Sequence, residues 1–354
     1  MATIKDVARL AGVGLGTASR AISGRGPVSE KALARVNDAV ATLQFRPSNV
    51  ARALASKMLG MIGIYVPDFS GNFYGPILQT VDGELRAVDR HMVAANGCGH
   101  GDARQQALDG IRFLYERECD GVLVVSNDLT DDDFTELFAR HPKLVLLNRH
   151  MPAQPDRCFS TDHEFGGRLA ARALLSQGHR EIALISGPHS APDNEQRLAG
   201  FLDELAQHKL HVPKRRRADA DFSFNGGYRA AEELLARSPR DYSALFCAND
   251  VMAMAAVSHL DKLGIDVPGD LSVLGFDNSD FSQYTAPKLT TIHVPIVEAA
   301  AAACRALLNQ CYGMGLPVTH DFQPEIVWRK SVGVGPHGAV SPKTKPKTKP
   351  KNTR

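Results

Sequence analysis

Several hallmarks of membrane and exported proteins are missing from this sequence of 354 residues. It contains no apolar run of the roughly 18 residues that a membrane-spanning helix needs. Its first residues, MATIKDVARLAG, lack the apolar core of a signal peptide. We therefore expect a cytoplasmic protein with no membrane partner.

Cysteine is scarce and scattered. The six cysteines, at positions 98, 119, 158, 247, 304 and 311, form no CxxC pair and stand mostly among apolar residues, as in LFCAND. This usage is typical of reduced, buried thiols and provides no paired-cysteine metal site.

Catalytic signatures are missing as well. The sequence has no Walker loop, no HExxH motif and no nucleophile elbow, and its 13 histidines show no ligand spacing. Nothing in it argues for an enzyme, a metal or a cofactor, and we expect none of the three.

What is present is a marked asymmetry of charge. Residues 1–57 carry nine basic and three acidic residues, and residues 341–354 carry six basic residues and no acid. The remaining body has a net charge of about −10, although the whole chain is only +2. A basic head on an acidic body predicts that the head binds a polyanion.

The head contains the glycine cluster AGVGLGTASR, which could be taken for a phosphate-binding loop. A dinucleotide fingerprint, however, needs a strand leading into its glycines. Here the preceding segment is helical, with Thr3 and Asp6 spaced as a capping box. Its apolar positions follow i, i+3, i+4 and i+7 at Ile4, Val7, Ala8 and Ala11. We therefore reject the cofactor-loop interpretation.

Two further short helices follow. LGTASRAIS ends before Gly24, and VSEKALARVNDAVATLQF has Ser29 as an N-cap. The third helix has an apolar face at Leu33, Val36, Val40 and Leu43. Three short helices with a turn at Gly12 predict a helix-turn-helix unit.

From residue 58 onward, short apolar strands alternate with helical segments. The expected strands are MIGIYV, HMVAAN, GVLVVS, LVLLN, EIALISG, ALFCAND, LSVLGFD and LTTIHV. This alternation predicts parallel sheets covered by helices, and the number of strands favours two α/β lobes. Polar residues end several strands (Asp68, Asn148 and Arg149, Asn249 and Asp250, Asp277 and Asn278). They favour a ligand cleft between the lobes over simple packing.

The C-terminal tail, SPKTKPKTKPKNTR, repeats Lys-Thr-Lys-Pro and has almost no apolar residue. We expect it to be disordered, with weak and nonspecific DNA contact as the alternative.

Taken in order, TIKDVARLAGV, TASRAI, RPSNVARALA, QGHREIALISG, QRLAGF, CAND and LGFDNS resemble the lactose-repressor family of bacterial transcription regulators. NRHMPAQPDRC and the DFSGNFYG loop are most similar to its galactose-repressor branch. The resemblance implies an all-α helix-turn-helix head and a core of two parallel-sheet α/β lobes, similar to periplasmic sugar-binding proteins.

The resemblance also implies domain boundaries. The head would span 1–45, a hinge helix 46–57, the core 58–333 and the disordered tail 334–354. Within the core, lobe 1 would hold about 58–157 and 292–320, and lobe 2 about 158–291 and 321–333.

By resemblance, the second helix, about Leu15 to Ser23, enters the DNA major groove with Leu15, Gly16 and Arg20 reading bases. Arg20 is the strong candidate for a base-reading residue, because a guanidinium can donate hydrogen bonds to guanine O6 and N7 at the same time. The alternative is a surface or phosphate contact by Arg20. Thr17 and Ser19 are further phosphate or base partners.

In the hinge, the resemblance makes Leu54 an apolar wedge in the central base step, which bends the DNA. Simple dimer packing is the alternative for Leu54. Asn49, Arg52 and Lys57 could contact the backbone or the groove floor.

In the cleft, the resemblance carries over Arg197, Asn249 and Asp277, with Phe222 at a stacking position. Their chemistry suits a sugar, because carboxylates, amides and a guanidinium bind vicinal hydroxyls while a ring stacks on C–H groups. Asp68, Phe73 and Asn148 would line the other lobe. Capping of helices or turns is the alternative for Asp68 and Asn148.

These observations predict a homodimeric repressor of a carbohydrate-utilisation operon that a sugar releases from palindromic operator DNA. Galactose, a β-glucoside or a disaccharide such as sucrose would suit the cleft, and some family members bind DNA better with their ligand. Members of the family with a tetramer-forming tail carry leucine heptads after the core, whereas this tail has Lys, Thr and Pro, so the resemblance favours a dimer. The rival hypothesis is a cytoplasmic sugar-binding or sugar-modifying protein with an appended head.

Overall fold

The structure is a computed structural model that describes residues 2–23, 26–45, 58–69, 73–97, 101–237 and 241–339. They belong to two compact units, Met1–Met61 and Ile62–Arg354, and each unit is considered by itself. The first unit is the head and the second is the core.

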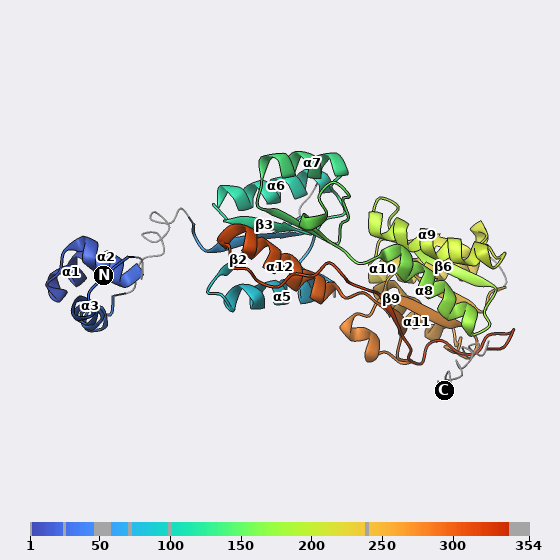
Figure 1. The fold of residues 1–354 in the computed structure, drawn as a ribbon. Coiled ribbons are helices and arrows are strands. Elements are labelled where there is room, and N and C mark those ends of the chain that lie inside the picture. The colour runs from blue at the N-terminus through green and yellow to red at the C-terminus, as the bar shows by residue number, and fades with distance from the viewer. Residues whose placement is uncertain are drawn as a thin grey trace, which may run out of the picture. The chain divides into compact units, whose positions relative to one another are not determined.

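The head contains three helices, α1 (Ile4–Ala11), α2 (Leu15–Ser23) and α3 (Glu30–Thr42) (Figure 1). Thr3 and Asp6 form the expected capping box at the start of α1. Gly12 ends α1 with a φ of 61°, a left-handed conformation that glycine adopts without a steric penalty. The helix-turn-helix prediction is therefore confirmed.

The small apolar centre of the head forms from α1 and α3, with Val7, Ala11, Val36 and Ala39 all buried. One predicted core position is wrong, because Leu33 is 38% exposed. Helix α3 instead buries Ala32 beside Val36 and Ala39, since these three residues lie on one face at i, i+4 and i+7.

Lobe 1 of the core is a five-stranded sheet in the order β2-β1-β3-β4-β5. Its strands are β1 (Met61–Val66), β2 (His91–Asn96), β3 (Gly121–Val124), β4 (Leu144–Leu147) and β5 (Cys158–Phe159). One face carries α5 (Tyr74–Arg86) and α12 (Ile296–Tyr312), and the other α6 (Ala103–Glu116) and α7 (Asp131–Arg140) (Figure 1). β1, β3, β4 and β5 pair in parallel, as the alternating pattern predicts.

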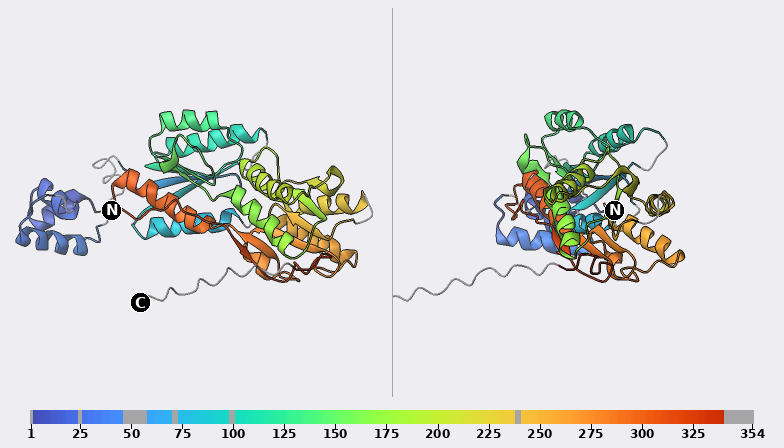
Figure 2. Two further views of the ribbon diagram at one scale, coloured as in Figure 1. Left: turned by 45° about the vertical axis from the view of Figure 1, so that its right-hand side comes forward. Right: turned by 90° about the vertical axis from the view of Figure 1, so that its right-hand side faces the viewer.

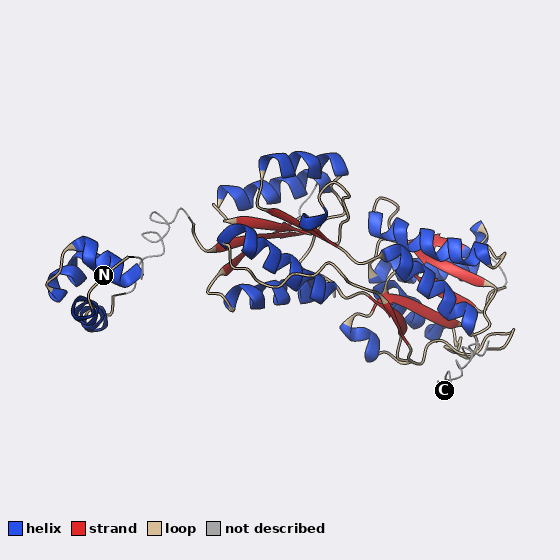
Figure 3. Cartoon of the chain, viewed as in Figure 1, coloured by secondary structure: helices blue, strands red, loops and turns tan. Residues whose placement is uncertain are grey.

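Lobe 2 is a six-stranded sheet in the order β11-β10-β9-β8-β6-β7. Its strands are β6 (Ile182–Ser186), β7 (Arg217–Asp219), β8 (Ala244–Cys247), β9 (Ser272–Asp277), β10 (Thr290–His293) and β11 (Glu325–Val327). Its helices are α8 (His163–Ser176), α9 (Pro192–Gln207), α10 (Phe224–Ala236) and α11 (Asp250–Lys262). All pairs except β10 with β11 are parallel. Figure 3 shows both sheets covered by helices on their two faces.

All eight predicted strands are present, whereas β5, β7 and β11 were not predicted. Each of these three has only two or three residues, too few for an alternating pattern to stand out.

The chain passes between the lobes more than once. It enters lobe 2 after β5, returns to lobe 1 between β10 and α12, and reaches lobe 2 again at β11. Figure 2 shows α12 packed on lobe 1, although the strands just before it belong to lobe 2.

The five cysteines within the described ranges, Cys119, Cys158, Cys247, Cys304 and Cys311, are buried free thiols, and Cys98 lies outside those ranges. None of the described helices is long and apolar enough to cross a membrane. The described residues also contain no group of His, Cys, Asp or Glu side chains arranged to hold a metal ion.

Candidate functional site

A pocket lies between the two lobes. It is lined by Phe73, Tyr74, Val125, Ser126, Asn127, Asn148, Asp193, Arg197, Phe222, Asn249 and Asp277. Many of these residues follow the carboxyl ends of parallel strands, where polar side chains from neighbouring strands meet. The structure thus brings together six of the seven predicted effector residues. The seventh, Asp68, is half-buried after β1 and is not part of this lining.

Three lining residues have left-handed backbones that side chains other than glycine rarely adopt. The φ angles are 60° at Asn148, 65° at Phe222 and 104° at Asp277. Asparagine and aspartate tolerate this region better than phenylalanine does. Such conformations cost on the order of 1–3 kcal/mol each and cluster at functional sites. The left-handed backbone conformations and the polar side chains therefore indicate the same functional site.

Arg197, on α9, is the centre of the pocket and is only 2% exposed. Its Nη1 donates to the backbone oxygen of Ala248 at 2.7 Å, and its Nη2 donates to Asp193 Oδ2 at 3.2 Å. Its Nε donates to His163 Nδ1 at 3.3 Å. These bonds hold the guanidinium in one orientation, as a preorganised recognition group requires.

Asp277, at the end of β9, faces the same guanidinium. Its Oδ1 lies 3.2 Å from Arg197 Nη1 but accepts no hydrogen bond from any described residue, although it is buried. Burial raises the pKa of Asp277 to about 7, while Arg197 acts in the opposite direction. Leaving a buried acceptor without a donor costs free energy of folding. This oxygen is therefore suited to accept a hydrogen bond from a hydroxyl of a ligand.

Asp193, which was not predicted, joins the two lobes. Its carboxylate, on α9 of lobe 2, accepts from Asn127 Nδ2 at 2.9 Å and from Asn148 Nδ2 at 3.2 Å, both in lobe 1. Burial works against its charge, but Arg197 and Asn148 help to hold its pKa below the usual value. Asp193 is therefore ionised and forms a direct polar link across the pocket.

His163, at the start of α8, fixes the orientation of Asn148. Burial, and then the charge of Arg197, lowers the pKa of His163 to about 3, so the ring is neutral. Since Nδ1 accepts from Arg197, the proton sits on Nε2 and is donated to Asn148 Oδ1 at 2.8 Å. The amide nitrogen of Asn148 is then directed toward Asp193.

The Phe222 ring forms an aromatic wall of the pocket, and its position depends on Gly187. A Cβ atom at this position would lie 2.3 Å from the Phe222 ring, so only glycine lets the ring lie there undisturbed. Asn249 adjoins this wall, but its side chain already caps α11 through Met252 N and donates to the backbone oxygen of Phe222. In this structure Asn249 therefore positions the phenylalanine as well as lining the pocket.

Sequence reasoning missed several lining residues, namely Tyr74, Val125, Ser126, Asn127 and Asp193. Two signals could have revealed some of them. The strand GVLVVS is followed by Asn127 at its polar end, like the other strand ends. Asp193 stands four residues before Arg197, on the same face of one helix.

In the head, helix α2 presents the predicted reading face. Leu15, Gly16, Ser19 and Arg20 are exposed, with Leu15 at 47%. Thr17 is partly buried and accepts a hydrogen bond from Arg20 Nη2 at 3.4 Å. The predicted hinge residues Asn49, Arg52, Leu54 and Lys57 lie outside the described residues.

Comparison with known proteins agrees with both units. Residues 3–48 match the family described as bacterial regulatory proteins, lacI family, and residues 171–332 match a periplasmic binding protein-like domain. The HTH-type transcriptional regulator GalR of Escherichia coli (strain K12) is 36% identical over 333 residues, which are 94% of this chain and 96% of that protein.

Solved structures give the same picture. A transcriptional regulator of the LacI family from Burkhoderia phymatum is 48% identical, with a TM-score of 0.74 over 77% of this chain and 99% of that one. The lac repressor dimer bound to operator and the anti-inducer ONPF is 25% identical, with a TM-score of 0.82 over 94% of this chain and 99% of that one. The chain therefore belongs to the lacI family of bacterial regulatory proteins and is a DNA-binding transcriptional regulator.

Proposed function

We propose that this chain is a homodimeric repressor of a carbohydrate-utilisation operon, and that a small neutral sugar releases it from a palindromic operator. The observation that carries the proposal is the convergence of Arg197, Asp193, Asp277 and the Phe222 ring on one pocket between two lobes. A guanidinium and two carboxylates pair with vicinal hydroxyls, and the ring packs against the C–H face of a sugar.

The charge of the pocket favours a neutral sugar over an anionic one. Asp193 and Asp277 share a single guanidinium, so the negative charge of a phosphate or carboxylate would meet two acidic side chains. Galactose, a β-glucoside and a disaccharide such as sucrose all meet this requirement.

In the head, Arg20 reads a base from the exposed face of α2, and Leu15 makes an apolar contact. Gly16 offers no side chain, and Thr17 and Ser19 contact phosphates or bases. A bidentate arginine–guanine pair contributes about 1–3 kcal/mol of discrimination.

Coupling runs through the hinge, residues 46–57, which joins the head (1–45) to the core (58–333). Sugar binding between the lobes changes the contacts of Asn127 and Asn148 with Asp193 and so shifts lobe 1 against lobe 2. That shift weakens the pairing of the two hinges, in which Leu54 is the wedge, and operator affinity falls.

The pocket acts in this proposal by binding, without catalysis and without a cofactor, and the regulator works in the cytoplasm. The rival function, a sugar-modifying protein with an appended head, would turn over its ligand. Incubation with each sugar followed by chromatography separates the two, because turnover would contradict the repressor.

The proposal is tested by selecting duplexes from a random pool with the purified protein, followed by calorimetry with galactose, a β-glucoside and sucrose. We expect a palindromic duplex to be enriched and one of the sugars to bind and release it. Failure to enrich a palindrome at any salt concentration, with or without sugar, would overturn the proposal.

A further inference from the structure

A strongly basic surface lies on lobe 2, away from the interlobe pocket. The run Lys214-Arg215-Arg216-Arg217 forms a 3₁₀ turn (Lys214–Arg216) and the first residue of β7, the edge strand of the lobe 2 sheet. Arg237 joins the run by donating from Nη1 to the backbone oxygen of Arg217 at 2.8 Å. We call these five residues the distal basic surface.

Carboxylates near this surface are fewer than its cations, and one of them, Asp219, is exposed on β7 two residues after Arg217. Asp241 pairs with both Arg215, at 2.6 Å, and Arg216, at 2.9 Å. Glu233 pairs with Arg237. Among the described residues, three of the five cations therefore form ion pairs, and they share two carboxylates. The surface is positive, although residues 58–340 as a whole carry about ten more acids than bases.

The C-terminal segment reaches the same end of lobe 2. Ser243, two residues after Asp241, donates its backbone N–H to the oxygen of Glu181 at 2.9 Å. His337 Nε2 lies 3.5 Å from the carboxylate of Glu181. The last described residues of the chain are therefore fixed beside the Asp241 region.

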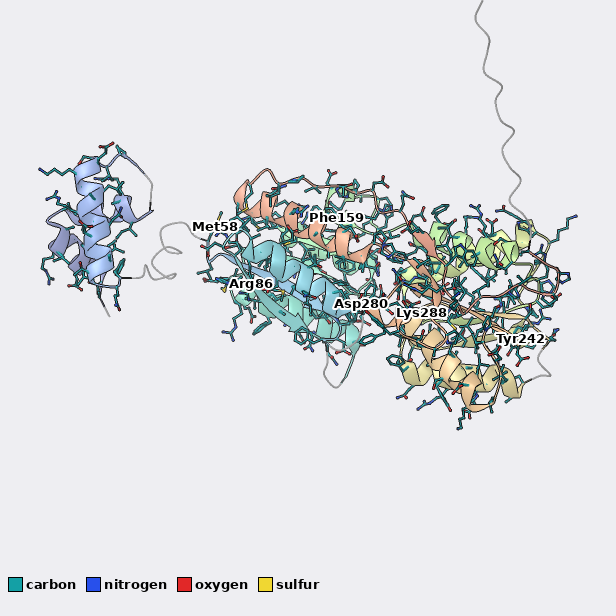
Figure 4. The ribbon with its side chains drawn as sticks, turned by 90° about the horizontal axis from the view of Figure 1, so that it is seen from below. Met58, Arg86, Phe159, Tyr242, Asp280 and Lys288 are labelled. Carbon is teal, nitrogen blue, oxygen red and sulfur yellow. The ribbon has the colours of Figure 1, made fainter. Side chains whose placement is uncertain are left out.

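Figure 4 shows where this region lies within the core. Tyr242, the neighbour of Asp241, is at the end of lobe 2 opposite Arg86 and Phe159 of lobe 1. The distal basic surface is thus separate from the pocket between the lobes.

The chemistry of the surface narrows its partner. The planar guanidinium of arginine can donate two parallel hydrogen bonds to the oxygens of one phosphate group. Residues 208–220, all of them described, include no exposed large apolar side chain, which a membrane anchor or a protein hot spot would need. Their exposed rings are the imidazoles of His208 and His211, and they include no Phe, Tyr or Trp on which single-stranded bases could stack more extensively. A duplex read only through its phosphates fits best.

We propose that the distal basic surface binds the backbone of a second DNA duplex regardless of its sequence. This inference rests on operator binding by the heads, which keeps the chain on DNA and raises the local concentration of further duplex. One dimer would then hold its operator and a second DNA segment together.

A two-duplex capture experiment tests the inference with the full chain. The protein is bound to an immobilised operator, and a labelled duplex without an operator site is added at about 50 mM salt. The dissociation constant of the labelled duplex is measured against salt concentration. The wild type should retain it, and the double variant Lys214→Glu, Arg217→Glu should bind it at least about tenfold more weakly. The slope of log K against log salt should fall by about two, since each lost phosphate contact removes about 0.9.

A matched control carries Arg112→Glu and Arg140→Glu, two exposed positions on α6 and α7 of lobe 1. It makes the same change in net charge and should retain the second duplex.

Operator capture is recorded in the same experiment, so a failure of the heads is seen separately. The inference is overturned if wild type holds operator but no second duplex, or if the double variant holds that duplex as well as wild type does. Preferential capture of an RNA duplex or of an anionic lipid vesicle would also overturn it.

Discussion

Asp193 on helix α9 of lobe 2 and Asn148 after strand β4 of lobe 1 are joined by a hydrogen bond of 3.2 Å across the pocket. The same carboxylate is paired with Arg197, which also faces Asp277. A ligand that competes for any of these groups therefore acts on the contact between the lobes. In the proposed mechanism, recognition of the sugar and movement of the lobes therefore depend on the same side chains.

Asp193→Asn should destabilise the core. The substitution keeps the size of the side chain but removes the charge that faces buried Arg197. Loss of one partner of a buried pair costs about 3 kcal/mol, and Asp277 remains as a second partner. Denaturant unfolding measures the change, with Asp203→Asn, an exposed position on the same helix, as the control. Equal stability of the two variants would contradict the role of Asp193.

Gly187→Ala should weaken sugar binding without affecting the operator. The new Cβ would displace the Phe222 ring, and overpacking of this kind costs about 1–3 kcal/mol. We expect affinity for the sugar to fall by about 10-fold to 100-fold in calorimetry. Gly83→Ala on α5, where a Cβ meets no atom within 4 Å, should leave sugar affinity unchanged. Unchanged affinity for the sugar in Gly187→Ala would show that the Phe222 ring is not part of the binding site.

His163 should make the core sensitive to acid. Its pKa in the folded chain is about 3, against an ordinary value of 6.5, so the unfolded chain takes up the proton first as pH falls. The stability of the wild type is then fully present above pH 6.5 and declines toward pH 3, by about 1.4 kcal/mol per unit. His163→Gln, which can still accept and donate one hydrogen bond each, should lack this part of the decline. The assignment would be refuted if the free energy of unfolding fell by the same amount in both proteins between pH 7 and pH 4.5.

Arg20→Ala should lower operator affinity and relax the choice of base at one position in each half-site. The expected loss is about 1–3 kcal/mol per half-site, most of it in discrimination. Anisotropy with operators mutated at each position measures the pattern, with Arg112→Ala in lobe 1 as the control. A uniform loss at every position would assign Arg20 to the phosphates instead.

The fold could be predicted well from the sequence, because its signals are local and repeated. The capping box at Thr3, the turn at Gly12 and eight apolar strands each leave a pattern within a few residues. The short strands β5, β7 and β11 leave none, because their pairing partners alone define them. Leu33 was misassigned because an apolar helix residue next to the buried face satisfies the same spacing.

The pocket could be predicted only in part. Arg197, Phe222 and Asp277 follow from the family resemblance, and the structure places them together. Asp193 and His163 also act through partners in other elements, up to 66 residues away along the chain, and no local pattern encodes those pairs. The left-handed backbone at Phe222 likewise arises from its surroundings, since phenylalanine does not favour it.

The central claim is that a sugar bound at Arg197 controls operator affinity. Its most direct test measures the fluorescence anisotropy of a labelled operator while the sugar is added to the wild type or to the variant Arg197→Lys. The lysine keeps the positive charge but lacks the planar guanidinium that donates to both Asp193 and Ala248. We expect the sugar to release wild type, and the variant to bind the operator equally well but to stay bound at the same sugar concentrations. Release of both proteins at the same sugar concentration would contradict the account.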